Sequence, residues 1–197
     1  RCTVPKPRFH LGIDLGTTNC ALASISADDS TGASNVLPLP QLHNENSQGA
    51  WETLPSFLYL PPDSAHPAAW IAGRWARTRA AETPGRVIHS AKSWLGHANV
   101  DRRAAFLPFG STDLEQGRQL SPIQASAHVL KTLANAWNHA HPDAPLAEQD
   151  VAITVPASFD PMAQQLTLEA AQLAGFPPET MLLEEPQAAF YAWQESN

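Results

Sequence analysis

Residues 9–26, FHLGIDLGTTNCALASIS, decide the fold of this chain. Two apolar runs, 9–14 and 20–26, flank a short turn that contains Gly16. Apolar runs on either side of a glycine-containing turn predict two strands joined as a hairpin. The first run ends on a carboxylate, Asp14, and the turn follows at once. The segment therefore predicts a strand pair with polar groups gathered at its tip.

The turn has the chemistry of a phosphate-binding loop. Gly16 allows the backbone to pass close to a ligand, and successive N–H groups in such a turn can form a concavity for an anion. Thr17 and Thr18 add hydroxyl donors, and Asp14 is suited to hold a metal directly or through water. An ordinary hairpin with a threonine-rich turn is the alternative interpretation, and this stretch alone leaves both open.

Strands and helices alternate in the second half of the chain. Ser121-Pro122 and Asp160-Pro161 each place an N-cap residue before proline, so each predicts the start of a helix. This order predicts the α/β class with a mixed sheet. The expected strands and the last helix are 151–155, 181–183 and 187–195.

The remaining segments give more local expectations. Helices are expected at 74–82 and 87–95, whereas the polar residues 41–53 predict a loop. On the helix after Asp160, helical spacing predicts which residues line the buried face. They are Met162, Leu166, Ala170 and Leu173.

Composition excludes several classes of protein. The 197 residues are 43% apolar with six Trp and seven Phe, enough for a substantial core. A net charge of -7 without a basic stripe argues against nucleic-acid binding and against a membrane-surface protein. Cys2 and Cys20 form no CxxC motif, which is typical of free thiols in a reducing cytosol, so we expect a cytoplasmic location.

Lys92 and Glu185 are candidate site residues, each with a simpler alternative. Lys92 is suited to stabilise transferring phosphate oxygens, or else it is a solvated helix-surface lysine. Glu185, before Pro186, is suited to orient or deprotonate an attacking water, or else it only interacts with a helix dipole.

Six segments resemble, in order, motifs of the DnaK-type (heat-shock protein 70) chaperone family. The resemblance runs from about residue 11 to 193 and is to the first lobe of the N-terminal ATPase domain, as a divergent member. The segments are 12–19 (GIDLGTTN), 53–56 (TLPS), 91–96 (AKSWLG), 126–131 (SAHVLK), 153–159 (ITVPASF) and 184–189 (EEPQAA).

The resemblance implies a ribonuclease-H-like, actin-like ATPase fold, of which the chain would be lobe I. Residues 9–52 and 121–197 would form the first subdomain, and 53–120 an inserted second subdomain. Residues 1–8 contain two prolines and three basic residues without a periodic pattern, which predicts a flexible tail. The resemblance also implies ATP or ADP and Mg²⁺ as ligands and gives roles to matching positions. These are phosphate contacts for Gly16, Thr17, Thr18 and Asn19, catalysis by Lys92, Glu185 and Thr17, the Mg²⁺ shell for Asp14, and a switch at Pro156.

Three positions depart from the family pattern. Gln164 stands where an arginine helps to pass the nucleotide signal, Glu184 replaces the Asn before the glutamate, and Ser158 replaces a Tyr. The second phosphate motif and the second lobe are also missing. We therefore expect this chain alone to fold, as a monomer or weak oligomer, without useful turnover.

Partners would be unfolded client proteins and co-chaperones, bound through other domains of the full-length protein. Two alternative functions remain at this level. One is a nucleotide-sensing or scaffold protein that keeps the fold with weakened catalysis. The other is a sugar or acid kinase of the same superfold, against which the segments 153–159 and 184–189 argue.

Overall fold

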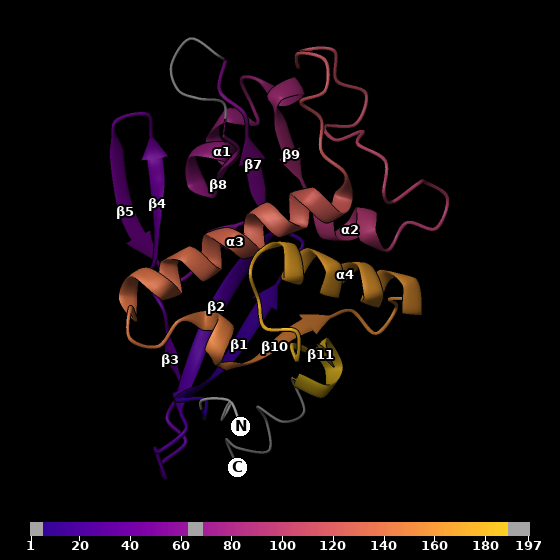
Figure 1. The fold of residues 1–197 in the computed structure, drawn as a ribbon. Coiled ribbons are helices and arrows are strands. Elements are labelled where there is room, and N and C mark those ends of the chain that lie inside the picture. The colour runs from indigo at the N-terminus through magenta and orange to yellow at the C-terminus, as the bar shows by residue number, and fades with distance from the viewer. Residues whose placement is uncertain (1–5, 63–68, 189–197) are drawn as a thin grey trace.

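The computed structural model describes residues 6–62 and 69–188, whose helices and strands are labelled in Figure 1. The helices are α1 (Arg74–Arg79), α2 (Ala91–Leu95), α3 (Pro122–Ala140) and α4 (Pro161–Leu173), with short 3-10 turns at Pro84–Arg86 and Leu146–Glu148. The strands are β1 (Phe9–Leu15), β2 (Asn19–Ser26), β3 (Asn35–Val36), β4 (Leu39–Asn44), β5 (Ser47–Trp51), β6 (Leu54–Pro55), β7 (Phe57–Tyr59), β8 (Ile71–Ala72), β9 (Val87–His89), β10 (Asp150–Val155) and β11 (Met181–Glu184).

The main sheet has the strand order β11-β10-β1-β2-β3. β1 and β2 form the predicted antiparallel hairpin, whereas β10 lies parallel to β1 and β11 lies parallel to β10. The short strand β6 pairs with the start of β2, next to the hairpin turn. The predicted mixed sheet of an α/β protein is therefore confirmed.

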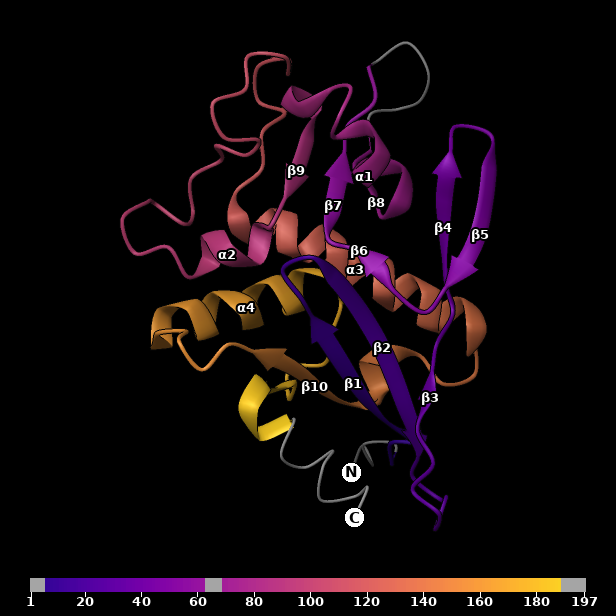
Figure 2. The same ribbon diagram turned by 180° about the vertical axis from the view of Figure 1, so that it is seen from behind.

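Helices α3 and α4 lie together against one face of this sheet (Figures 1 and 2). Both begin where the sequence predicts. The Ser121 hydroxyl accepts a hydrogen bond from the Gln124 amide at 3.1 Å, and the Gln124 side chain accepts one from the Ser121 amide at 2.9 Å. The Asp160 carboxylate accepts from the Ala163 amide at 2.6 Å. These caps satisfy backbone donors that a helix start leaves unpaired.

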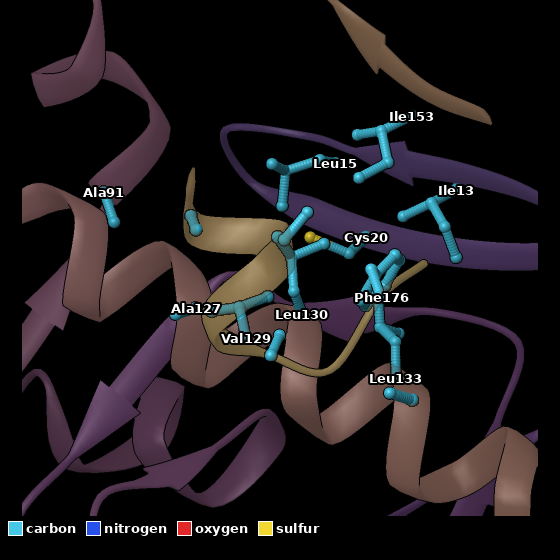
Figure 3. Packing of buried hydrophobic residues seen from close by; sticks show 14 of the residues in the cluster. Ile13, Leu15, Cys20, Ala91, Ala127, Val129, Leu130, Leu133, Ile153 and Phe176 are labelled. Atoms are coloured by element: carbon cyan, nitrogen blue, oxygen red, sulfur yellow. The ribbon is translucent and has the colours of Figure 1, made fainter. Parts of the chain in front are cut away.

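The core lies between the sheet and α3. Along β1 every second side chain is buried, as expected for a strand with one covered face. Ile13 and Leu15 from β1 and Ile153 from β10 lie on the side of the sheet that faces Leu130 and Leu133 of α3 (Figure 3). Burial of such side chains stabilises each by roughly 1.5–3 kcal/mol relative to exposure.

Trp137 of α3 fills the far end of the core. It is fully buried, and its indole N–H donates to the carbonyl of Ala144 at 2.8 Å. The His141 ring stacks on it at 3.8 Å, and Phe9 of β1 meets its edge at 5.2 Å. A buried indole with a hydrogen-bond partner combines a large apolar contact area with a satisfied donor.

The segment 41–53, predicted as a loop, instead contains most of an antiparallel hairpin of β4 and β5. Gln41 attaches the hairpin to its surroundings, because its side chain accepts from the Arg74 amide at 3.0 Å and donates to the Thr53 carbonyl at 2.9 Å. The prediction failed because few residues of this hairpin are buried, so its sequence lacks the apolar alternation of a covered strand.

The predicted helix 87–95 is wrong in its first half. β9 pairs with β7 in a separate sheet of order β8-β7-β9, and only Ala91–Leu95 is helical. Ser90 separates the two with a left-handed backbone, φ 55. The predicted helix 74–82 forms over Arg74–Arg79, and the expected helix 187–195 lies almost wholly outside the described residues.

The predicted buried face of α4 is half right. Leu166 and Ala170 are buried, but Met162 is 52% exposed and Leu173 is 62% exposed. The buried face consists of smaller side chains, which allow a helix to approach its neighbour closely. Its members are Ala163, Leu166, Thr167, Ala170 and Ala171.

Two adjacent arginines join the long segment after α2 to α4. The Arg102 guanidinium binds both carboxylate oxygens of Asp160, at 3.0 and 2.9 Å. Arg103 binds both carboxylate oxygens of Glu169, at 2.7 and 2.8 Å. The Arg102 hydrogen bonds, together with the capping amide of Ala163, lower the pKa of Asp160 to about 2. Within the described ranges no helix has the length and apolar character needed to cross a membrane.

Candidate functional site

Three neighbouring parallel strands end at the same edge of the main sheet. β1, β10 and β11 run in one direction, and Asp14, Pro156 and Glu185 stand at or just beyond their carboxyl ends. In open α/β sheets, ligands bind outside the carboxyl ends of the strands. The topology therefore brings together three residues that the sequence analysis had selected separately.

The loop Gly16–Asn19 forms the tip of the β1–β2 hairpin at this edge. Thr17 and Thr18 are exposed, so their hydroxyl groups are available to a ligand. A Cβ added at Gly16 would lie 2.0 Å from the carbonyl oxygen of Asn19, and therefore only glycine fits there. The close turn and the exposed hydroxyls are the features that a phosphate loop requires.

Asp14 is exposed near the end of β1. The Thr154 hydroxyl, on the neighbouring strand β10, donates to its Oδ1 at 3.0 Å. This bond fixes the orientation of the carboxylate and leaves further acceptor positions free for other donors or a cation. Sequence analysis did not select Thr154, although a polar residue between buried Ile153 and Val155 was a usable signal.

Lys92 is 4% exposed, so it is not the solvated surface lysine of the alternative interpretation. Its Nζ donates to Oε1 of Glu185 at 2.7 Å. The Glu185 side chain is 48% exposed. A buried ammonium is costly unless it is paired, and this carboxylate pairs it.

The charges of Asp14 and Lys92 both act on Cys20, which is fully buried at the start of β2. Burial is the main reason that the pKa of the Cys20 thiol is raised to about 11. Asp14 raises this pKa further and Lys92 lowers it. Cys20 itself lies at the base of the Gly16–Asn19 loop, since its sulfur is 3.8 Å from the Gly16 carbonyl oxygen.

Pro156 follows β10 directly and begins the connection to α4. Its carbonyl accepts from the Phe159 amide at 3.0 Å, which closes a turn before the Asp160 cap. On α4 the Gln164 side chain donates to the Phe159 carbonyl at 3.4 Å. The turn at Pro156 therefore lies directly before the start of α4, and a change in the turn would occur beside the first residues of that helix.

Ser56 is a second residue that sequence analysis did not assign to the site. It follows β6 and is only 7% exposed. Its hydroxyl donates to the Gly16 carbonyl at 2.7 Å. A serine directly after Pro55 in an otherwise apolar strand was the available signal.

The site fits a magnesium nucleotide better than a metal held by protein alone. Among residues 6–62 and 69–188, no group of three or more His, Cys, Asp or Glu side chains is arranged to hold a metal. Mg²⁺ usually retains several waters and binds one or two carboxylates together with substrate phosphates. A single oriented carboxylate, Asp14, beside a phosphate-type loop matches that pattern.

Comparison with known proteins identifies the family. The model of the family described as "Hsp70 protein" matches residues 10–193. The chain therefore belongs to the Hsp70 family, and its mixed α/β architecture is that of an Hsp70 ATPase lobe of the actin-like fold, as the motifs implied.

Individual relatives are chaperones by name. The chain is 35% identical to "Chaperone protein HscA" of Klebsiella pneumoniae subsp. pneumoniae and 34% identical to "Chaperone protein HscA homolog" of Tolumonas auensis, in both cases over 94% of this chain. It is 31% identical to the homolog of Laribacter hongkongensis over 96% of this chain. These matches cover 28–29% of each relative, so the chain spans less than a third of their length.

Proposed function

We propose that this chain is the first lobe of the ATPase domain of a chaperone, and that the full-length protein hydrolyses ATP to drive cycles of protein folding. The observation that carries the proposal is the Lys92–Glu185 pair at 2.7 Å, at the carboxyl edge of the sheet. A positive charge, a carboxylate and a phosphate-binding loop are the three features that an enzyme needs for phosphoryl transfer to water.

The proposed reaction is in-line attack of water on the γ-phosphate of ATP. The water oxygen bonds to phosphorus, the bond to the β–γ bridging oxygen breaks, and ADP leaves. Glu185 orients the water and accepts its proton, and Lys92 stabilises charge on the γ-phosphate oxygens. The backbone and hydroxyls of Gly16, Thr17, Thr18 and Asn19 hold the phosphates, with Thr17 closest to the reacting group.

Asp14 would hold the Mg²⁺ that accompanies the nucleotide, directly or through water. The bound ion supplies neutralisation of phosphate charge. Thr154 supports this role because its hydroxyl keeps the Asp14 carboxylate in one orientation at 3.0 Å. The protein itself would therefore supply one pre-oriented carboxylate, Asp14, rather than a complete set of ligands for the ion.

Pro156 is proposed as the switch that relays nucleotide state. Its support is its position, since it directly follows β10 and leads through a closed turn to the cap of α4. Client proteins and co-chaperones would bind other domains of the full-length protein, in the cytoplasm. Gln164, in place of the arginine expected from the family, predicts altered coupling between nucleotide and client sites.

The proposed subdomains are 9–52 with 121–197, and 53–120. The separate sheet β8-β7-β9 supports this division, although β6, which falls in the second unit by sequence, pairs with β2 in the main sheet. The β4–β5 hairpin belongs to the first unit by sequence, yet it contacts α1 of the second through Gln41 and Arg74.

Calorimetric titration with MgATP tests the proposal. It compares this chain with a longer one that continues through the second lobe. Tight binding by the longer chain alone supports a site formed between two lobes. Absence of binding by both contradicts the ATPase proposal and leaves the loop as a structural turn.

A nucleotide-sensing or scaffold function with weakened catalysis is the second candidate. Glu184 favours it, because this half-buried carboxylate stands next to Glu185 and adds negative charge near the proposed attacking water. Nucleotide binding without turnover in the full-length protein would establish it. A Glu184→Asn variant that gains turnover would show that this charge is the cause.

A further inference from the structure

Ser56 forms hydrogen bonds to the phosphate-type loop with both its side chain and its main chain. Its hydroxyl donates to the Gly16 carbonyl at 2.7 Å, and its amide donates to the Thr18 carbonyl at 2.8 Å. Thr17 lies between these two anchored carbonyls. Ser56 is distant in sequence and belongs to the turn between β6 and β7, so the loop is held from outside its own hairpin.

The direction of these bonds determines where the loop's donors point. Within the described residues the only cis peptide bond is Leu107–Pro108, so the Gly16–Thr17 bond is trans. In a trans peptide the C=O and the following N–H point in opposite directions. A Gly16 carbonyl that faces Ser56 therefore turns the Thr17 N–H away from Ser56, toward the open side of the loop. A donor fixed in advance costs no reorganisation when charge develops.

Cys20 completes a chain of hydrogen bonds behind the loop. Its sulfur lies 3.2 Å from the Ser56 hydroxyl oxygen. The single hydrogen of the Ser56 hydroxyl is engaged with the Gly16 carbonyl at 2.7 Å, which makes the thiol the donor in this contact. The sulfur also lies 3.8 Å from the Gly16 carbonyl oxygen, a second acceptor for the same thiol hydrogen. Burial keeps the pKa of the Cys20 thiol at about 11, and the thiol therefore remains protonated near neutral pH. Cys20, Ser56 and the Gly16 carbonyl therefore form one hydrogen-bonded group behind the loop.

We infer that Ser56 is a positioning residue of the phosphate site, which fixes the Gly16–Thr18 backbone so that the Thr17 N–H faces the bound phosphate. The inference rests on the proposed nucleotide function. If the inference is right, a residue from the middle of the chain fixes the conformation of a loop near the beginning of the chain. Ser56 itself does not touch the nucleotide.

Ser56→Ala in the full-length protein tests the inference, with Ser111→Ala as the matched control. Ser111 also donates its hydroxyl to a glycine carbonyl, that of Gly85, at 2.5 Å, but it has no bond to the loop. Ser56→Ala removes the 2.7 Å hydrogen bond to the part-buried Gly16 carbonyl and leaves it with the longer contact to the Cys20 sulfur, at 3.8 Å. We expect kcat/KM for MgATP to fall about tenfold. Ser111→Ala should match the wild type, and Ser56→Thr, which keeps both donors, should stay within about twofold of it.

Hydrogen exchange of the peptide that contains residues 14–20 gives a readout independent of turnover. In Ser56→Ala the loop amides should exchange faster, whereas Ser111→Ala should leave them unchanged. Full turnover and unchanged exchange in a folded Ser56→Ala protein would overturn the inference. A wild-type protein that binds no nucleotide, but whose loop loosens in Ser56→Ala, would instead refute the proposed function and keep Ser56 as a loop anchor.

Discussion

The Nζ of Lys92 lies 2.7 Å from Oε1 of Glu185, although 93 positions separate the two residues in the chain. The lysine side chain is buried and the carboxylate is half-exposed. This ion pair joins α2, from the middle of the chain, to the residue that directly follows β11. Because the Glu185 carboxylate is open to solvent, a water can approach it beside the Lys92 ammonium.

Lys92→Ala should abolish useful ATP hydrolysis in the full-length protein. Loss of one preset electrostatic stabiliser typically costs about 10²–10³-fold in kcat. Lys131→Ala is the matched control, because Lys131 is an exposed lysine on α3. The measurement is steady-state phosphate release by protein whose melting temperature has been checked. Unchanged turnover in Lys92→Ala would remove this residue from the mechanism.

Glu185→Gln should retain MgATP binding and lose the chemical step. The amide oxygen can still accept from Lys92, so the buried ammonium keeps a partner, but an amide cannot take a proton from water. We expect single-turnover hydrolysis to slow by about 10²-fold or more. Glu179→Gln, at an exposed position, serves as the control. A parallel loss of affinity and rate would assign Glu185 to nucleotide binding instead.

Asp160 should make the stability of the protein sensitive to acid. Its folded-state pKa, about 2, is below the ordinary value of 3.8 because of Arg102 and the Ala163 amide. The stabilisation is thus fully present above pH 3.8 and is lost as pH falls toward about 2. In urea unfolding, Asp160→Asn should be less stable than the wild type down to about pH 4, and the difference should shrink below it.

The exposed loop residue Asp28 supplies the control for this acid dependence. Asp28→Asn should match the wild type near neutral pH. A gap between wild type and Asp160→Asn that stayed constant down to pH 2 would contradict the assignment to the Arg102 pair.

Cys20 should be unreactive while the protein is folded. Its thiol is fully buried and its pKa is about 11, so almost no thiolate is present at neutral pH. In a Cys2→Ser background, iodoacetamide should modify Cys20 only after denaturation. Mass spectrometry of native and urea-unfolded samples makes the comparison. Rapid native labelling would show that the thiol is exposed by local opening.

Trp137→Ala should be the most destabilising single change considered. The side chain is fully buried, and the substitution deletes both its packing against Phe9 and its bond to the Ala144 carbonyl. The expected loss in free energy of unfolding is about 3–5 kcal/mol. Trp137→Phe, which keeps a ring, should cost less. Denaturant melts of both variants check the order.

The sequence allowed the starts of helices to be predicted well, but it did not allow a good prediction of which side chains are exposed to solvent. The starts of α3 and α4 were predictable because cap and proline chemistry is written in adjacent residues, Ser121-Pro122 and Asp160-Pro161. The exposed side of α4 was not predictable in this way. Met162 and Leu173 are more hydrophobic than alanine, yet it is mainly alanines that form the buried face of this helix. Exposure of a helix face depends on which elements cover it, and this is a tertiary property.

The same distinction applies to the site. The loop Gly16–Asn19 was visible as a contiguous motif, and Lys92 and Glu185 were visible as motif members. Their contact with each other was not, because it depends on the placement of α2 against the end of β11. Ser56 and Thr154 were missed because their significance comes from neighbours on other strands. Their roles, and those of the site residues as a group, stay predictions until tested.

The adjacent arginines 102 and 103 attach one segment of chain to α4 at two points, Asp160 and Glu169. The two carboxylates are nine positions apart in the chain, which corresponds to about 13.5 Å along a helix axis. A segment attached at one point could rotate about it, whereas attachment at two points fixes its orientation relative to α4. Both pairs are bidentate, the geometry in which a surface arginine–carboxylate pair contributes most, and the Arg102 side chain is only 11% exposed. The segment after α2 is thus joined to α4 at both Asp160 and Glu169, and a displacement of the helix would be transmitted to it.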